Sequence, residues 1–305
     1  MRKTLAFVAT LGVLAALTAC SSAPAGGCSA ALPSGDASSV VSATGKFGTE
    51  PKIDIPTPLH AKTSQASTLI KGTGEKVGLG QPMVVEVTIL NGTDGAVIQQ
   101  TSYSSTGGTL LTAGDKNFPA IANGLVCTTV GSRVAVVGSP KDSHGEQADP
   151  TNGIAAEDAF VYVVDVKKAF PARADGADQV PQNGLPAISL AADGTPGLTF
   201  SAATAPKKLT TEVTKTGDGE KVKKDSFIVV KYSTFSWGTS PAMTDSNWST
   251  GSASVWQMGS ADVAAPLNTE LVGKRAGSQV LVVAPGSGSS DTPTVYVVDI
   301  LGVVQ

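Results

Sequence analysis

The sequence predicts an α+β protein of two tandem domains, each a twisted antiparallel β-sheet wrapped on one short helix. Three observations support this prediction. The chain of 305 residues is long enough for two ordinary domains. Short alternating apolar segments are separated by glycine and proline, and only 5 % of the residues are aromatic, as is typical of turn-rich β proteins. Finally, segments of the first half recur in the second half at a fixed spacing.

The repeat is clearest in two glycine turns that each lead into a strand. GTGEKVGLGQPMVVEVT begins at Gly72, and GDGEKVKKDSFIVVKYS begins 145 residues later at Gly217. Trp248 follows Tyr103 at the same offset. The closing strands, AFVYVVDV and TVYVVDI, are only 134 residues apart, so the second copy has a shorter loop before its last strand. Chance similarity among Gly- and Val-rich segments does not account for anchors in one order at one offset, and we infer a duplication.

The N-terminus predicts an exported, lipid-anchored protein. Arg2 and Lys3 precede an apolar run that is too short to span a bilayer, and residues 17–20 read Leu-Thr-Ala-Cys. This ending resembles the lipobox of bacterial lipoproteins, so we expect cleavage before Cys20 and its diacylation at the extracytoplasmic face of the bacterial cell membrane. The alternative is an ordinary secretory signal that happens to end in cysteine.

The composition then changes along the chain in a way that predicts the domain boundaries. We expect a signal peptide over residues 1–19, the lipidated cysteine and a flexible spacer over 20–44, a first domain over 45–168, a linker over 169–189 and a second domain over 190–305.

Cysteine usage and charge limit the chemistry that we expect. Outside the cytoplasm Cys28 and Cys127 can form a disulfide, although two unpaired thiols remain the alternative. With only two histidines in the chain we expect no metal and no cofactor. A net charge of −3 with scattered basic residues predicts no nucleic-acid partner, and we expect a monomer.

The order of signals in each half resembles the FKBP-type peptidyl-prolyl cis-trans isomerases. In the second copy a G-x-G turn, a V-V-K-Y-S strand, a polar bend, a W-x-M-G segment, a short helix, a G-S strand and a V-Y-V-V-D strand occur in the family's order over about 110 residues. The resemblance implies an α+β fold and a proline pocket. The isomerisation that the resemblance implies requires no nucleophile, metal or cofactor.

The resemblance implies an aromatic pocket in the second copy. Tyr232 falls on the tyrosine of the family's V-x-Y-T strand, Trp256 on the phenylalanine of F-x-L-G, and Tyr296 on the phenylalanine of the closing strand. Asp245 lies one place late for the acid of F-D-S-S. The alternatives are plain core packing for the aromatic residues and turn capping for Asp245.

The same resemblance assigns roles around the short helix. Val263 and Ala264 occupy the V-I positions, where the family holds the substrate carbonyl with a backbone N–H. Leu267 stands where a pocket-floor tryptophan is usual, and the loop tyrosine has no counterpart, because the loop after Pro285 is too short.

The first copy carries a weaker substrate-binding set that departs from the family pattern at several positions. Val87 stands in place of the strand tyrosine, and His144 stands in place of the loop tyrosine or is simply a solvated loop residue. The full set is Val87, Ile98, Phe118, Ile121, His144, Ile154 and Tyr162.

These features predict a lipid-anchored prolyl isomerase that acts on X–Pro segments of exported or unfolded proteins. The main alternative is a binding module, in which both pockets have decayed to peptide-binding or chaperone surfaces. A small-ligand-binding lipoprotein is a third class, which the missing α/β alternation disfavours.

The predicted anchor has a direct test. Cys20→Ser removes the only acylation site that the lipobox offers, so the variant should leave the membrane fraction and appear in the soluble fraction. A Cys28→Ser variant should stay with the membrane. Membrane retention of the Cys20→Ser protein would contradict lipidation as the tether.

Overall fold

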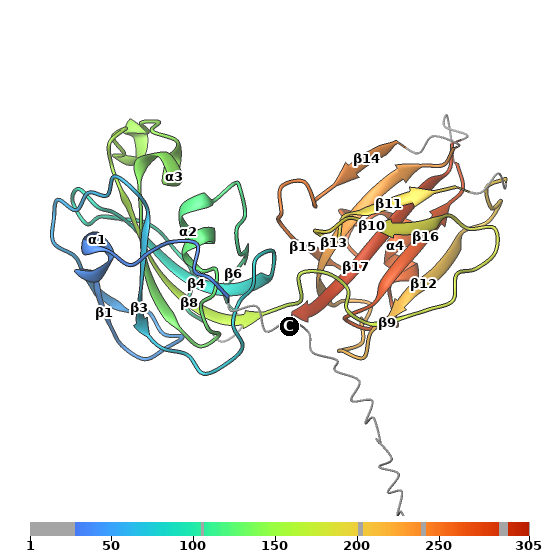
Figure 1. The fold of residues 1–305 in the computed structure, drawn as a ribbon, viewed down its shortest axis with the longest axis horizontal. Coiled ribbons are helices and arrows are strands. Elements are labelled where there is room, and N and C mark those ends of the chain that lie inside the picture. Colours follow the sequence, from blue (N-terminus) through green and yellow to red (C-terminus); the bar gives the residue numbers. More distant parts are fainter. Residues whose placement is uncertain (1–27, 105–106, 201–203, 239–241, 287–291, 305) are drawn as a thin grey trace, which may run out of the picture.

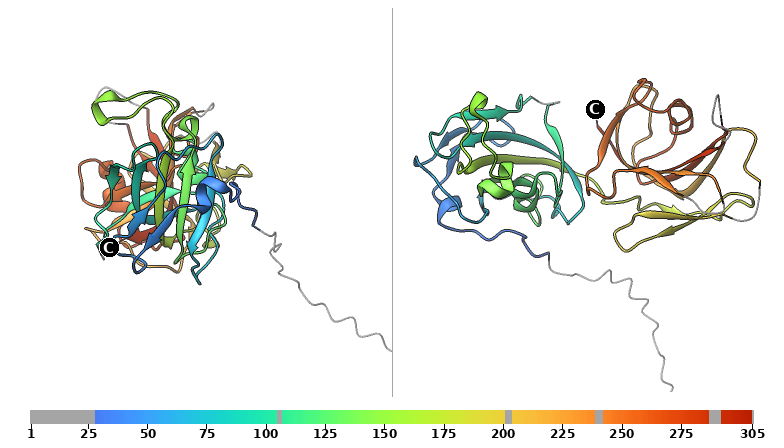
Figure 2. Two further views of the ribbon diagram at one scale, coloured as in Figure 1. Left: turned by 90° about the vertical axis from the view of Figure 1, so that its left-hand side faces the viewer. Right: turned by 90° about the horizontal axis from the view of Figure 1, so that it is seen from above.

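The computed structural model describes residues 28–104, 107–200, 204–238, 242–286 and 292–304. Cys20 and the predicted signal peptide lie outside these residues. Figure 1 shows two β-rich bodies side by side, and the right-hand view in Figure 2 shows the same arrangement from above. Within the described ranges, no helix is long and apolar enough to cross a bilayer.

The first body is built on a six-stranded antiparallel sheet in the order β3-β7-β8-β4-β5, with β6 also paired to β4. Its strands are β3 (Gln65–Ile70), β4 (Pro82–Asn91), β5 (Val97–Gln100), β6 (Thr109–Thr112), β7 (Arg133–Gly138) and β8 (Phe160–Ala169).

The second body repeats this order in a seven-stranded sheet, β14-β13-β17-β16-β12-β9, with β15 also paired to β13. Its strands are β9 (Ala177–Asp178), β12 (Thr210–Thr216), β13 (Phe227–Ser236), β14 (Met243–Ser246), β15 (Ser254–Gln257), β16 (Gln279–Ala284) and β17 (Thr294–Val304). Apart from the added edge strand β9, each strand has a counterpart in the first sheet, so the repeat in the sequence is also a repeat in topology.

A short helix covers one face of each sheet, as the sequence predicts. These helices are α2 (Pro119–Gly124) and α4 (Ala265–Glu270), and both have proline in the first turn, where its missing N–H costs no helical hydrogen bond. Leu125 beside α2 and Leu267 within α4 lie in the apolar clusters on these faces. The burial of this helix face, rather than helix propensity, stabilises so short a helix.

The opposite face of each sheet is covered as well, which the sequence analysis did not predict. A two-stranded hairpin, β1 (Ser42–Thr44) with β2 (Lys52–Asp54), packs on the first sheet, and β10 (Ala187–Leu190) with β11 (Pro196–Thr199) packs on the second. The central strands are apolar on both faces, as in the run Phe160–Val164, and such strands require two covered faces.

These hairpins shorten the expected spacer and linker. Residues 28–44, expected as spacer, include α1 (Asp36–Ser39) and β1, and the side chain of Gln65 accepts hydrogen bonds from two backbone N–H groups of α1. The expected linker contains the buried Phe170, the edge strand β9 and the start of β10. Tertiary contacts therefore order segments whose polar composition alone predicts loops.

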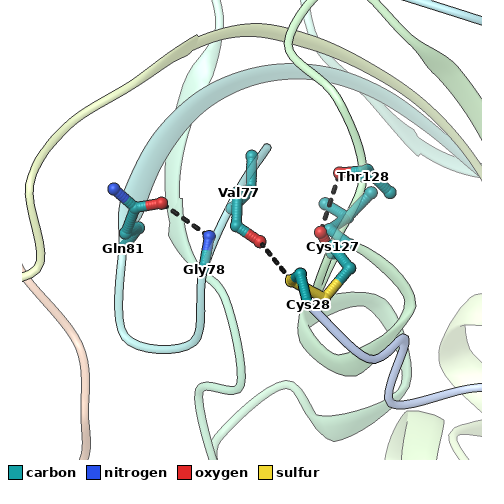
Figure 3. Close-up of a disulfide and its surroundings, with 7 residues drawn as sticks. Cys28, Val77, Gly78, Gln81, Cys127 and Thr128 are labelled. Atoms are coloured by element: carbon teal, nitrogen blue, oxygen red, sulfur yellow. Dashed lines mark hydrogen bonds between the residues drawn. A yellow bond between two sulfur atoms is a disulfide. The ribbon is translucent and has the colours of Figure 1, made fainter. Parts of the chain in front are cut away.

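Cys28 and Cys127 form a disulfide that ties the start of the described chain to the first domain (Figure 3). The two cysteines are 99 residues apart in the sequence, and Cys127 follows α2 directly before the turn that leads to β7. A crosslink across so long a loop restricts the unfolded chain and stabilises the fold by roughly 2–4 kcal/mol.

The two domains meet through a small apolar cluster. Phe170, Val229 and Leu301 are buried there, with Val84 and Leu110 packed against them. Polar contacts join the same junction: the backbone N–H of Ala253 donates to Thr112 Oγ1, and Ser252 Oγ donates to Asp115 Oδ2. Two grooves, of about 560 and about 450 Å³, lie at this junction between the domains.

Candidate active site

The structure brings the predicted residues of the second domain together on the helix-side face of the sheet. Tyr232 on β13, Trp256 on β15 and Tyr296 on β17 are partly buried and pack on one apolar cluster. The floor of the cluster includes Val263 and Leu267, which are 4 % and 2 % exposed. We call these five residues, with Asp245 and Ala264, the aromatic site.

Strand register explains why these side chains share a face. Tyr232 is opposite Val298 on β17, and Thr234 is opposite Tyr296. Because directly opposed residues of an antiparallel pair point to the same side, Tyr232 and Tyr296 lie on the face that packs on α4. β15 pairs with the first half of β13 and adds Trp256 to this face.

The phenol of Tyr232 is held from two directions. Its hydroxyl donates a hydrogen bond of 2.8 Å to Asp245 Oδ2 on β14, and its ring lies 5.1 Å from the indole of Trp256, tilted by 44°. Asp245 therefore reaches Tyr232 although it lies one place late in the sequence motif.

Both tyrosines of the aromatic site are neutral phenols over the physiological pH range. Burial, the hydrogen bond to Asp245 and the charge of that carboxylate together raise the pKa of Tyr232 to about 12. Burial also raises the pKa of Tyr296. A neutral ring fits an apolar site better than a phenolate, which attracts water.

A backbone donor is available at the start of α4. The N–H of Val263 reaches the carbonyl of Ser260 at 3.4 Å, whereas the N–H of Ala264 donates to none of the described residues. Ala264 is the N-cap residue and packs at the edge of the apolar cluster. Its N–H is thus free to bind a ligand carbonyl beside the apolar floor.

Two asparagines that the sequence analysis did not single out hold this arrangement. Asn247 accepts from the N–H of Tyr232 and donates to the carbonyl of Val230, so it replaces strand hydrogen bonds where β14 leaves β13. Asn268 on α4 donates to the carbonyls of Ser260 and Val263. Asn247 follows Ser246 in the polar bend, and this position is a weak sequence signal for a turn-stabilising side chain. No sequence signal marks Asn268.

The corresponding set in the first domain is closed. Val87, Ile121 and Tyr162 are 5–7 % exposed, and Ile98 and Ile154 pack against the same cluster. Burial raises the pKa of Tyr162 to about 12. These residues form core rather than an open surface.

The longer loop of the first domain contributes to this closure. It contains α3 (Pro140–His144) and the 3₁₀ turn η1 (Pro150–Asn152). The ring of His144 lies 4.8 Å from the ring of Phe160, and its two nitrogens lie within hydrogen-bond distance of the carbonyl oxygens of Gln147 and Asp158. His144 is therefore a structural part of the loop that covers Phe160.

Phe118 does not join the first domain's set. It is the N-cap residue of α2 and is 59 % exposed, because the turn before the helix directs this position away from the sheet. Among the described residues, no group of three or more His, Cys, Asp or Glu side chains is placed to hold a metal ion.

No family model matches this sequence, and no curated protein matches it. Solved structures that resemble the fold are FKBP domains. The three FKBP domains of wheat FKBP73 share 15 % identity, with a TM-score of 0.36 over 79 % of this chain and 94 % of that one. The N-terminal domain of FKBP42 from Arabidopsis thaliana shares 15 % identity, with a TM-score of 0.33 over 40 % of this chain and 97 % of that one.

A peptidyl-prolyl cis-trans isomerase from Pseudomonas syringae also shares 15 % identity, with a TM-score of 0.30 over 36 % of this chain and 77 % of that one.

The hydrogen bond between Tyr232 and Asp245 predicts a pKa change. Asp245→Asn removes a negative charge that opposes the phenolate, so the pKa of Tyr232 should fall from about 12 toward the ordinary 10.0. Titration of the tyrosine ring carbons by NMR measures this shift. Asp262→Asn removes an exposed acid with no bond to Tyr232 and serves as the control.

The same shift predicts how stability depends on pH. The folded pKa of Tyr232 lies above its ordinary value, so its contribution to the free energy of unfolding is complete below pH 10.0 and is lost as the pH rises toward about 12.

In the NMR titration, equal pKa values of Tyr232 in the Asp245→Asn and Asp262→Asn proteins would contradict the hydrogen bond between Tyr232 and Asp245.

Proposed function

We propose that the second domain catalyses cis–trans isomerisation of X–Pro peptide bonds at the aromatic site. The observation that carries this proposal is the combination of three aromatic rings around an aliphatic floor with the free backbone N–H of Ala264. These are the features that the sequence motifs imply, and they come from three separate strands and from the start of one helix.

The chemistry needs little beyond this arrangement. Rotation about an X–Pro bond faces a barrier of about 18–20 kcal/mol, because resonance keeps the amide planar. The twisted amide of the transition state has lost this resonance and is less polar than the planar form. An apolar surface that excludes water therefore favours the twisted amide over the hydrated ground state.

Each part of the aromatic site has a role in this scheme. The proline ring packs between Tyr232, Trp256 and Tyr296 and above Leu267. The N–H of Ala264 binds the carbonyl that flanks the proline and holds it while the amide rotates. Asp245 fixes the ring of Tyr232 through its hydroxyl. No covalent intermediate forms.

We propose that the protein works outside the cytoplasm on X–Pro segments of exported proteins, anchored through the lipid on Cys20. The signal-like N-terminus supports this location, and a disulfide between Cys28 and Cys127 suits an oxidising compartment. Proline isomerisation takes tens of seconds and limits folding there as elsewhere.

The second candidate function is peptide binding with little turnover. Leu267 supplies a smaller floor than the usual tryptophan, and the first domain's set is buried. A site that binds proline segments without stabilising the twisted amide would act as a folding chaperone, and the assay below separates the two.

The enzyme proposal predicts that the purified full chain accelerates a proline-limited refolding reaction. Tyr232→Ala removes one wall of the site and should lower the rate constant for catalysis by about tenfold, which corresponds to about 1.4 kcal/mol of transition-state stabilisation. The measurement is the slow refolding phase of a reference protein, followed by fluorescence at several concentrations of the chain.

The matched control is Phe227→Ala, an exposed aromatic residue at the start of the same strand, which should leave the acceleration unchanged. Binding of an unfolded chain without any acceleration would sink the enzyme proposal and favour the chaperone. An equal loss in both variants would show that the effect does not come from the aromatic site.

A further inference from the structure

Lys231 is a largely buried lysine whose ammonium group has no polar partner within the part of the chain that the structure describes. Lys231 directly precedes Tyr232 on β13. Its side chain points to the opposite face of the sheet, because side chains alternate along a strand. The residue is 4 % exposed. Among the described residues its Nζ makes no hydrogen bond and no ion pair, and it lies 4.6 Å above the ring of Trp248.

The nearby acids stabilise the charge of Lys231 only from a distance. Three carboxylates act on it electrostatically, but none lies within ion-pair distance, and each has hydrogen-bond partners of its own. Asp115 accepts from Ser252 and Asn117, Asp193 from Thr195, and Asp299 from Ala174 and Gln279.

Burial of most of the Lys231 side chain removes part of the hydration of its ammonium group, and no partner within ion-pair distance compensates for this loss. Burial lowers the pKa of Lys231 in accordance with this cost. A cation–π contact with Trp248 offsets part of it. The indole N–H of Trp248 is also buried without a hydrogen-bond partner among the described residues. The buried indole N–H of Trp248 and the neighbouring ammonium of Lys231 thus both lack an acceptor among the described residues.

Lys231 and Trp248 line the groove of about 450 Å³ between the two domains, which we call the Lys231 groove. Lys116 reaches it from the first domain and Arg173 from the segment between the domains, while Asp193 is the one acid among the lining residues. The charged residues that line the groove therefore sum to a positive charge, and both domains contribute to it.

The first domain shows what these two positions look like when they are satisfied. Glu86 and Tyr103 precede Lys231 and Trp248 by the repeat offset of 145 residues. Glu86 is fully buried, pairs with Lys167 at 3.2 Å and accepts from the N–H of Tyr103. The charged residue of this position has partners within the chain in the first copy and lacks them in the second.

We propose that the Lys231 groove binds a small oxyanion, a carboxylate or a phosphate group, with the ammonium of Lys231 as its central ligand and Lys116 and Arg173 at the rim. Such a ligand supplies the acceptor that Lys231 lacks and bridges the two domains. The groove is on the other face of β13 from the aromatic site, so its ligand is distinct from the X–Pro substrate.

The test is calorimetric titration of the purified full chain with inorganic phosphate and, separately, with succinate, at constant ionic strength set by chloride. At least one probe should bind saturably and raise the melting temperature. Lys231→Met should weaken this binding at least tenfold, whereas Lys208→Met, which removes an exposed lysine away from the groove, should leave it unchanged. Phosphate binding alone assigns a phosphate ligand, and succinate binding alone assigns a carboxylate.

A double variant of the rim, Lys116→Met with Arg173→Met, keeps the inference testable if Lys231→Met fails to fold, because both rim residues are exposed. It should weaken the same binding severalfold. The inference is overturned if neither probe binds above chloride, or if binding persists unchanged in the Lys231→Met protein or, where that protein does not fold, in the rim variant.

Discussion

The register of β13 against β17 is the constraint on which the other features of the second domain depend. This pair is antiparallel along the whole of β13, and both of its faces are buried. The alternation places Tyr232 toward α4 and Lys231 toward the domain junction. A shift of one residue would exchange the two faces and place a lysine in the aromatic site. The bulge between Val229 and Val230 sets this register locally.

The two copies of the fold differ in how far the helix-side face of the sheet is covered. In the first domain a long loop with α3 packs over the helix-side face, and Val87 leaves no aromatic ring at the position of Tyr232. In the second domain the loop is shorter, and Tyr232 and Tyr296 stay partly exposed. The first domain, which carries the disulfide, thus buries this set of residues, whereas the second domain keeps an accessible apolar surface.

Local sequence signals predicted the parts of the structure that depend on neighbouring residues. The glycine turns, the alternating strands and the short helix before Leu271 all lie where such patterns indicate. Alignment of motifs also brought Tyr232 and Trp256 together. The hairpin layers, the exposed position of Phe118 and the unpaired ammonium of Lys231 depend on contacts between distant segments, and no local pattern encodes them. The hydrogen bond between Tyr232 and Asp245 was predicted in part. The bend motif indicated Asp245 as a site residue, but it did not indicate the contact with Tyr232.

Catalysis at the aromatic site, as we propose it, requires that the site twist an X–Pro amide while the N–H of Ala264 holds the neighbouring carbonyl. Two-dimensional exchange NMR of a proline peptide, with a small amount of the full chain, measures whether the cis–trans exchange is catalysed. The amide shifts of the chain are followed in parallel. We expect faster exchange between the cis and trans peptide signals, together with a downfield shift of the Ala264 amide that saturates with the peptide. An unchanged exchange rate, with the Ala264 amide unmoved at saturating peptide, would contradict the proposed catalysis.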